Sequence, residues 1–544
     1  MKRSMIALGM AALATVGCDP EAAVLVEGAR LHSANGMFFD LQGRLNVASV
    51  LGNEIVQLDP GTGVVLGRLG LSEGVDGPDD LTIGPDGSLY WTSLVSGQVG
   101  RRQPSGATTF QQVAPGVNPI TFSDDGRLFV ALDFLGDALY ELDPDLALPP
   151  RLIAQNLGFL NGMDFGPDGR LYGPIFTQGR VVSIDVDSCE GATDPYAECD
   201  IQTVADGFFV PAAVKFDALA RLHVVDQSGE VFRVDTATGA KQVIAVLPPG
   251  LDNLAFHPAT NHLYVSSAND GFVVRVRADG TTQTLSPGGM IAPGGVAVLG
   301  AAGQESVFVA DVLTLREFDG ETGAQLSQVA NVVGSSELTT PTNVSADGAN
   351  LILSSWFGNA VQVWDPAAQQ VLESYADFLQ PISALRFEGD LVVAEGGFAS
   401  GQGRVVRQTS GGRVTLADAL GLPSGLAAAG GDLWFADWEA GAVYQVIDDG
   451  AQLPAPVLVA GGLEGPEGLA VDPHGGLLVV EASAGRLSRI DPATGAVTEL
   501  VSGLATGLAP LTGAPPLYVF SGVTVGPSGA VYVTGDLDNV LYRL

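Results

Sequence analysis

One phrase recurs along the chain and constrains the fold more than any other feature. It consists of a short apolar segment, a turn with Asp-Gly or a related pair, and a second apolar segment. Clear copies begin at Asp79, Asn118, Asn161, Glu467 and Ser521. Asp-Gly between alternating apolar segments favours a β-hairpin, because glycine adopts the positive φ that tight turns require. Each copy therefore predicts two antiparallel strands.

Two further strands follow in most copies. A third apolar segment ends in Asp, as at 57–59, 141–143 and 489–491, and a second turn leads to a fourth apolar segment. Four antiparallel strands in a repeat of about 40–50 residues are typical of a β-propeller blade. The sequence therefore predicts an all-β fold made of four-stranded antiparallel blades.

The number of copies predicts two rings. Twelve first strands begin near Asn35, Asp79, Asn118, Asn161, Ala212, Asp252, Gly294, Thr342, Ser383, Ser424, Glu467 and Ser521. A propeller usually has about four to eight blades, so twelve favour two tandem six-bladed β-propellers. We assign 19–294 to the first and 295–544 to the second, with seven plus five blades as the alternative. We expect the segment 23–27 to complete the sixth blade and the segment 281–285 to complete the twelfth.

The N-terminus resembles a targeting segment. A basic start, Met-Lys-Arg, precedes a short apolar run that ends at Gly17 and Cys18. The run is too short to span a membrane and is typical of a signal peptide. A small residue before cysteine resembles the bacterial lipoprotein motif, although Thr15 stands where leucine is usual. We expect residues 1–18 to be a lipoprotein signal with Cys18 lipidated, which places the protein in the bacterial cell envelope. An ordinary secretory signal is the alternative.

Charge and cysteine content narrow the function classes. The chain has 61 acidic and 25 basic residues, a net charge of −36, whereas a nucleic-acid-binding protein needs a basic surface. Nucleic acid is therefore excluded as a partner. Besides Cys18 the sequence contains only Cys189 and Cys199. In an exported protein, two cysteines in one polar insertion predict a disulfide.

Polar residues begin the innermost strands of the first ring. Five of its six blades carry Asn or Asp at this position: Asn35, Asp79, Asn118, Asn161 and Asp252. Carboxylate and amide oxygens that converge on a channel suit a hard cation such as Ca²⁺. The alternative is that these side chains cap the strands by hydrogen bonds to nearby backbone N–H groups. The matching positions of the second ring are mostly Gly, Ser or Thr.

A second acidic set lies where the second strands of the second ring end. It comprises Asp311, Glu395, Asp437 and Glu481. We interpret these carboxylates mainly as acceptors of turn hydrogen bonds, with a second cation or ligand site that includes Glu467 as the alternative.

The phrase Gly-Pro-Asp-Gly-x-Leu-Tyr resembles NHL-repeat propellers, and the segment 161–172 is similar to the senescence marker protein–gluconolactonase family. The resemblance implies a six-bladed, calcium-dependent propeller with lactonase activity, in which Asn161 corresponds to a calcium ligand. Asp252 and Asn253 resemble a ligand pair of the related paraoxonases. Asn35 and Ala212 depart from the family, which has Glu and Asp there, and this disfavours the family's chemistry.

Two function classes follow. The first is a cell-envelope lipoprotein whose propeller faces bind a small molecule or a protein, with Ca²⁺ in the first channel. The second is a calcium-dependent lactonase or related hydrolase, for which the sequence assigns no catalytic residue. In both cases we expect a monomer that reaches the membrane only through its lipid anchor.

Overall fold

The computed structural model describes residues 22–330, 336–397, 399–512 and 519–544. The predicted signal segment and Cys18 lie outside these ranges. The described chain forms twelve four-stranded antiparallel sheets, which confirms the predicted fold class. Within the described ranges, no helix is long and apolar enough to cross a membrane.

The first six sheets form one closed ring. Their strands, from the channel outward, are β2 (Met37–Phe39), β3 (Leu45–Ser49), β4 (Glu54–Leu58) and β5 (Val65–Leu69); β6 (Pro78–Ile83), β7 (Leu89–Ser93), β8 (Gln98–Arg102) and β9 (Thr108–Gln112); β10 (Val117–Phe122), β11 (Leu128–Leu132), β12 (Ala138–Leu142) and β13 (Arg151–Gln155); β14 (Asp164–Phe165), β15 (Leu171–Ile175), β16 (Arg180–Ile184) and β17 (Ile201–Ala205); β18 (Pro211–Phe216), β19 (Leu222–Asp226), β20 (Glu230–Val234) and β21 (Lys241–Val246); β22 (Leu251–Phe256), β23 (Leu263–Ser267), β24 (Val273–Val276) and β25 (Thr282–Ser286). Each innermost strand packs against the next, and β22 packs against β2.

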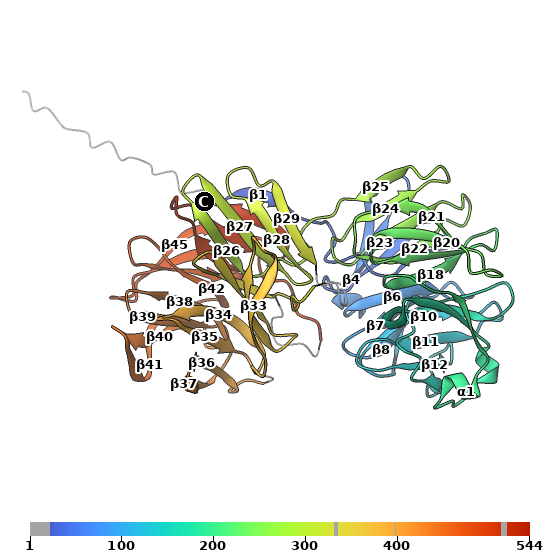
Figure 1. Cartoon of the computed structure of the whole chain (residues 1–544), viewed down its shortest axis with the longest axis horizontal. Coiled ribbons are helices and arrows are strands. Elements are labelled where there is room, and N and C mark those ends of the chain that lie inside the picture. Colours follow the sequence, from blue (N-terminus) through green and yellow to red (C-terminus); the bar gives the residue numbers. More distant parts are fainter. Residues whose placement is uncertain (1–21, 331–335, 398, 513–518) are drawn as a thin grey trace, which may run out of the picture.

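The other six sheets form the second ring. Their strands are β26 (Val296–Ala301), β27 (Gln304–Asp311), β28 (Thr314–Asp319) and β29 (Gln325–Ala330); β30 (Asn343–Asp347), β31 (Asn350–Ser355), β32 (Ala360–Asp365) and β33 (Gln370–Tyr375); β34 (Pro381–Phe387), β35 (Asp390–Glu395), β36 (Gly403–Thr409) and β37 (Gly412–Leu420); β38 (Pro423–Ala429), β39 (Asp432–Asp437), β40 (Ala442–Asp448) and β41 (Ala451–Gly461); β42 (Pro466–Val471), β43 (Leu477–Glu481), β44 (Arg486–Ile490) and β45 (Val497–Ser502); β46 (Val523–Val525), β47 (Val531–Gly535), β48 (Val540–Arg543) and β1 (Ala23–Glu27). β26 packs against β46, so this ring also closes with six blades. Figure 1 shows the two rings as two lobes lying next to each other.

The strands that complete the sixth and twelfth blades differ from the prediction. β25 pairs with β24 in the sixth sheet, and β1 pairs with β48 in the twelfth, with Ala23 opposite Arg543 and Glu27 opposite Val540. Figure 1 accordingly shows the blue β1 within the lobe of the second ring. The physical reason is that β24 and β25 are joined by a short turn, and local pairing costs less loop entropy than pairing with a distant segment. Residues 23–27 therefore belong structurally to the second ring.

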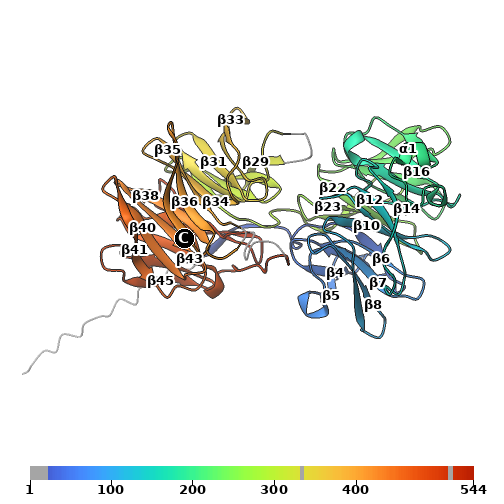
Figure 2. The same ribbon diagram turned by 90° about the horizontal axis from the view of Figure 1, so that it is seen from below.

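The two rings meet through an apolar cluster. The first ring contributes Ala29, Val50 and Leu51, and the second contributes Ile291, Ala292, Leu508, Leu511 and Val519. Hydrogen bonds flank this cluster, from Asn53 Nδ2 to the carbonyl of Ala509 at 2.9 Å and from Asn539 Nδ2 to the carbonyl of Ala29 at 3.0 Å. Figure 2 shows the chain crossing between the rings in this region.

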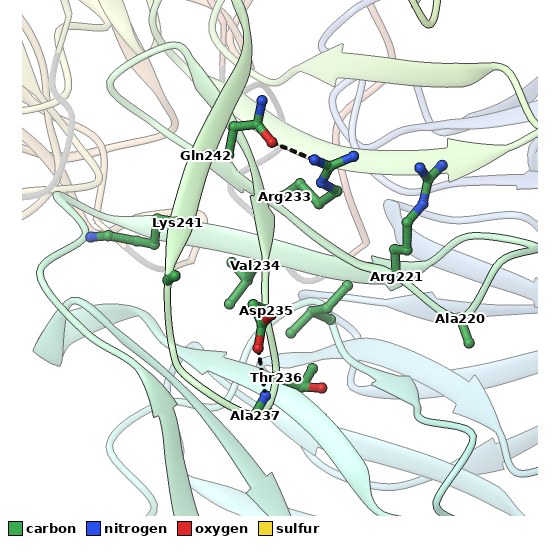
Figure 3. Close-up of a pocket in the computed structure, with 11 residues that line it drawn as sticks. Ala220, Arg221, Arg233, Val234, Asp235, Thr236, Ala237, Lys241 and Gln242 are labelled. Carbon is green, nitrogen blue, oxygen red and sulfur yellow. Dashed lines mark hydrogen bonds between the residues drawn. The ribbon is translucent and has the colours of Figure 1, made fainter.

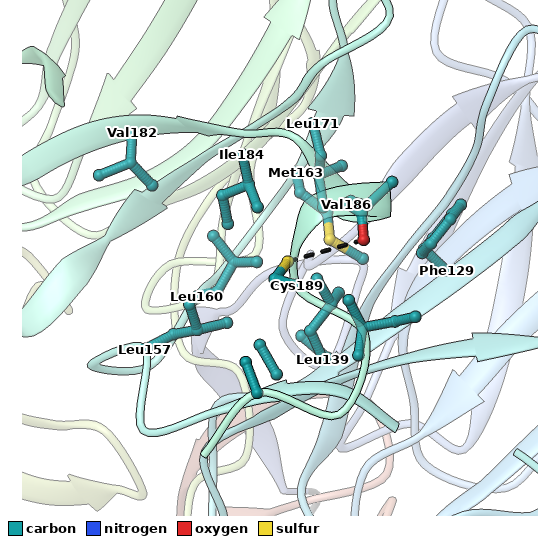
Figure 4. Close-up of a cluster of buried hydrophobic side chains, with 14 of the residues drawn as sticks. Phe129, Leu139, Leu157, Leu160, Met163, Leu171, Val182, Ile184, Val186 and Cys189 are labelled. Atoms are coloured by element: carbon teal, nitrogen blue, oxygen red, sulfur yellow. Dashed lines mark hydrogen bonds between the residues drawn. The ribbon is translucent and has the colours of Figure 1, made fainter. Parts of the chain in front are cut away.

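The insertion that carries Cys189 and Cys199 packs onto the fourth blade. It contains the 3-10 turn Val186–Ser188 and the helix α1 (Pro195–Glu198). Both cysteines are free thiols, so the predicted disulfide is absent. Both cysteines border the same apolar cluster, but the Cys189 thiol donates to the backbone carbonyl of Val186 at 3.6 Å (Figure 4) and is not bonded to Cys199. Burial raises the pKa of the Cys199 thiol to about 11, which disfavours the reactive thiolate.

Candidate functional site

The innermost strands of the first ring place the predicted residues around its channel. Asp79, Asn118 and Asp252 are each the second residue of their strands, β6, β10 and β22. Asn35 and Asn161 lie just before β2 and β14. Since these strands surround one channel in the same direction, their first residues lie at the same end of it.

Asp79 and Asp252 are the two acidic members of the predicted set, and they have no neutralising partner. Among the described residues, neither carboxylate accepts a hydrogen bond or forms an ion pair. Burial, together with the neighbouring charge of Asp80, raises the pKa of Asp79 to about 7. Burial also raises the pKa of Asp252 well above its ordinary value, and the charges of Asp79, Asp80 and Asp133 add to this effect. The channel mouth therefore holds carboxylates that keep their protons to a higher pH than an ordinary aspartate does.

Asp133 is a third carboxylate of this group, and the sequence analysis missed it. It follows the last residue of β11, and its Oδ2 accepts a hydrogen bond from Asn118 Nδ2 at 3.0 Å. Its other oxygen is buried without a hydrogen-bond partner in the described structure. Burial raises the pKa of Asp133 well above its ordinary value, and the charge of Asp79 raises it further.

The predicted asparagines divide into two kinds. The amide oxygen of Asn35 accepts a hydrogen bond from Ser33 Oγ at 2.9 Å. The amide oxygen of Asn253 accepts one from the Leu254 backbone N–H at 2.8 Å. Asn161 Oδ1 accepts from the Gly162 N–H at 2.7 Å and from Asn118 Nδ2 at 3.3 Å. Such local hydrogen bonds are what we expect if these side chains cap the strands, which the sequence analysis gave as the alternative to cation binding. Asn118 uses only its amide nitrogen in these bonds, so its amide oxygen is available to a ligand.

A half-buried lysine lies near a separate pair of carboxylates in the same channel. Lys215 Nζ donates to the carbonyl of Met163 at 3.1 Å. Burial raises the pKa values of Asp80 and Asp164, whereas the charge of Lys215 lowers both. Asp80 also accepts hydrogen bonds from the Ile120 N–H at 3.1 Å and from Asn253 Nδ2 at 3.2 Å. Asp80 and Asp164 are therefore satisfied within the protein, unlike Asp79, Asp133 and Asp252.

We tested whether the residues of the mouth could hold a cation. Across the described ranges, no group of three or more His, Cys, Asp or Glu side chains has the spacing of a metal site. The predicted site does not require three such side chains, because it combines two carboxylates with amide oxygens. Oxygen ligands of both kinds suit Ca²⁺. The oxygens of Asp79 and Asp252 and the amide oxygen of Asn118 fit that chemistry, while those of Asn35, Asn161 and Asn253 already accept hydrogen bonds.

The acidic set of the second ring has a different role. Asp311 accepts the Ile291 and Ala292 N–H groups at 2.8 Å, and Asp437 accepts the Gly421 N–H at 3.0 Å and the Leu422 N–H at 2.9 Å. Glu395 and Glu481 similarly accept backbone N–H groups and pair with arginines. This arrangement agrees with the interpretation as turn acceptors, because each bond joins the end of a second strand to the segment that enters its blade.

Glu467 differs from these acids because it is fully buried and only half satisfied. Its Oε2 accepts the Ser521 N–H at 2.6 Å, and its Oε1 has no partner in the described structure. Burial raises the pKa of Glu467 well above its ordinary value, with a further contribution from the charge of Asp536. Close by, the channel of the second ring encloses a cavity of about 240 Å³ that backbone and small side chains of the inner strands line.

A larger hollow of about 570 Å³ lies on the fifth blade of the first ring. Figure 3 shows Arg233 paired with Gln242, while Lys241 points away from them. Lys241 Nζ donates to the carbonyls of Asp206 and Gly207 at 2.7 Å and lies 4.2 Å from the centre of the Phe208 ring. Arg221 is paired with Asp217. The basic groups here hold the blade together and leave no unpaired cluster.

Comparisons with known proteins bear on the fold alone. No family model and no curated protein matches the sequence. Among solved structures, virginiamycin B lyase from Staphylococcus aureus is 14% identical over 53% of this chain and 94% of its own, with a TM-score of 0.37. A gluconolactonase from Xanthomonas campestris is 16% identical over 45% of this chain and 86% of its own, with a TM-score of 0.36. The chain is therefore similar to single β-propellers, each of which spans about half of it.

Proposed function

We propose that the first propeller binds one divalent cation, Ca²⁺, at the mouth of its channel. Asp79 and Asp252 would be its charged ligands and Asn118 a neutral one. The observation that carries the proposal is the group of buried carboxylates whose pKa values burial and mutual repulsion raise. Buried charges need a partner, and here no basic side chain among the described residues supplies it.

The second ring supplies an internal contrast. Its acids at the ends of the second strands are bonded to backbone N–H groups, and three of them also pair with arginine. Asp80 and Asp164 in the first ring likewise lie near Lys215. The carboxylates of Asp79 and Asp252 at the first channel mouth lack such compensation, and this favours an external cation there.

Calorimetry of the full chain tests the cation. After EDTA treatment, Ca²⁺ should bind once, with a dissociation constant of about 10⁻⁴–10⁻³ M, which is typical of extracellular modules with few charged ligands. Because a cation displaces protons from the carboxylates, binding should release protons and weaken as the pH falls below 7. Titration in buffers of different ionisation enthalpy measures that release.

Two variants and a control decide the assignment. Asp252→Asn and Asp79→Asn should each weaken Ca²⁺ binding by at least about tenfold, since a charged contact contributes roughly 1.5–3 kcal/mol. Asp206→Asn removes the same charge from an exposed position and should change nothing. Equal heats from the wild type and from Asp252→Asn would show that the polar ring only caps strands.

Lactone hydrolysis is the second candidate function, and the partial exposure of the mouth favours it. Asp252 and Asn118 are half-buried, so a cation that they hold would keep positions open to solvent. Bound Ca²⁺ can polarise the carbonyl of a substrate. A panel of lactones assayed with and without EDTA tests this activity, and hydrolysis that survives both EDTA and Asp252→Asn would refute it.

We also propose that the protein is exported and lipid-anchored at Cys18, with its propeller faces open to a small molecule or a protein. The sequence pattern of residues 1–18 supports this. Cys18→Ser should move the protein out of the membrane fraction and abolish acyl-chain labelling. Continued labelling of that variant would refute the anchor.

A further inference from the structure

Asn118 is the neutral ligand of the proposed cation site, and it lies where its strand is irregular. The register of β10 and β11 shifts between Val117 and Ile120, and Asn118 lies inside this β-bulge. Asp79 and Asp252 lie inside the matching bulges of β6 and β22. Bulges redirect side chains next to binding sites, so one backbone feature places all three proposed ligands. The bulge does not decide which end of the Asn118 amide faces a cation.

Two hydrogen bonds decide the orientation of that amide. Asn118 Nδ2 donates to Asp133 Oδ2 at 3.0 Å and to Asn161 Oδ1 at 3.3 Å. A carboxylate and an amide oxygen are both acceptors. A flipped amide would place the Asn118 oxygen against these two oxygens with no hydrogen between them. The two bonds therefore hold the nitrogen and leave the Asn118 oxygen for a ligand.

The loop that carries Asp133 is itself held in place. The Asp133 backbone N–H donates to the carbonyl of Gly116 at 3.3 Å. Gly116 has a φ of 93° and approaches the loop so closely that a Cβ there would lie 1.2 Å from the carbonyl oxygen of Phe134. The side chain of Phe134 stacks on that of Phe357, which belongs to the second propeller, with 5.7 Å between the ring centres. The Asp133 carboxylate is therefore attached to a loop restrained by both propellers.

We propose that Asp133 is a positioning residue of the cation site: its carboxylate holds the amide nitrogen of Asn118 and thereby presents the amide oxygen to the cation. This inference rests on the proposed binding of Ca²⁺ and adds a residue that does not touch the ion. Its Oδ2 is bonded to Asn118, and its Oδ1 is buried. Partners of this kind, which orient a metal ligand from behind, typically contribute about 10–100-fold to metal affinity.

Calcium titration of the full chain, followed by the rise in unfolding temperature, measures this contribution. Asp133→Ala should weaken Ca²⁺ binding by at least about tenfold. The control is Asp226→Ala, which truncates a buried carboxylate that accepts backbone N–H groups in the fifth blade. It should lower the stability of the calcium-free protein and leave the affinity for Ca²⁺ unchanged.

The outcomes separate the positioning role from the cation site itself. Unchanged affinity in Asp133→Ala, with binding still weakened in Asp252→Asn, would overturn the positioning role and leave the cation site standing. Absence of Ca²⁺ binding by the wild type would overturn both.

Reciprocal variants separate the hydrogen bond from the charge of Asp133, which also acts on Asp252. Asp133→Asn should weaken Ca²⁺ binding in the wild-type background. In the Asn118→Asp background two carboxylates meet, and Asp133→Asn restores a donor opposite an acceptor with the roles exchanged. The same substitution should therefore tighten Ca²⁺ binding there, a reversal of sign that a double-mutant cycle measures. Weakening in both backgrounds would show that Asp133 acts through its charge alone and would overturn the positioning role.

Discussion

The buried guanidinium of Arg316 fixes the junction between the rings, and its removal should destabilise the protein strongly. Arg316 is 1% exposed and belongs to β28 of the second ring. Its Nε lies 2.6 Å from Asp311, and its Nη2 lies 2.9 Å from both Asp270 Oδ1 and the carbonyl of Asn269, which belong to the first ring. One side chain thus joins a carboxylate of each ring.

Arg316→Met keeps much of the side-chain volume and removes the charge. Asp311 then remains buried without its cation, and breaking a buried pair in this way costs about 3–5 kcal/mol. The loss should be smaller at pH 5 than at pH 8. Without Arg316 the pKa of Asp311 rises further above its ordinary value, so protonation relieves the buried charge at low pH.

Urea unfolding followed by tryptophan fluorescence measures this loss. Trp91 lies in the first ring and the other four tryptophans lie in the second, so the two rings can be followed separately after Trp91→Phe. The control is Arg386→Met, which breaks a half-exposed pair with Asp347 and should cost less than about 1 kcal/mol. A loss below about 1 kcal/mol for Arg316→Met as well would refute the reasoning that the junction depends on this buried charge.

Three further changes test the buried carboxylates. Glu467→Gln should flatten the pH dependence of the free energy of unfolding. Because the pKa of Glu467 is raised, the folded state binds more protons than the unfolded state, so wild-type stability falls as the pH rises above about 4.3. Parallel pH curves for the wild type and the variant would contradict this. Asp226→Ala removes the acceptor of the Phe209, Val210 and Ser228 N–H groups and should lower the free energy of unfolding in urea by about 3 kcal/mol. Asp235→Ala, at an exposed position, is the control and should cost less. Equal losses would refute the role of Asp226 as a structural acceptor. Lys215→Met removes the charge that lowers the pKa values of Asp80 and Asp164. It should therefore lower the free energy of unfolding more at pH 8 than at pH 5, and a loss independent of pH would count against that charge interaction.

The blades could be predicted from the sequence because each one is local. A hairpin turn, alternating apolar residues and a terminal Asp specify four neighbouring strands, as in β42 to β45. The position of β1 could not be derived this way, since β1 and β25 are candidates for the same two blade edges and neither carries a repeated motif that names its partner strand. The disulfide was wrong because sequence separation does not show where a thiol points: Cys189 and Cys199 border one apolar cluster, yet the Cys189 thiol donates to the carbonyl of Val186.

The channel mouth was predicted in part. Alignment of the copies found Asp79, Asn118 and Asp252, because their place in the repeat fixes their place in the ring. Asp133 escaped because it lies one residue beyond its strand, where no repeated position marks it. In the fifth blade, Asp226 is the last residue of the second strand. Asp133 lies one residue beyond the matching position of the third blade, and this was the only sequence signal for it. Hydrogen bonding of Asn35 and Asn253 is likewise invisible in a sequence, since it depends on the rotamer that each side chain adopts.

The two rings share a fold and differ in how they compensate negative charge. In the second ring, Asp311, Glu395 and Glu481 pair with Arg316, Arg404 and Arg486, so the acids stabilise the scaffold. In the first ring, the charge of Lys215 lowers the pKa values of Asp80 and Asp164, and the mouth retains its uncompensated carboxylates. Leaving buried charge unpaired lowers stability, and such sites are common where proteins bind ligands. This difference supports the cation site that we propose for the first ring, while Arg316 ties the second ring to it.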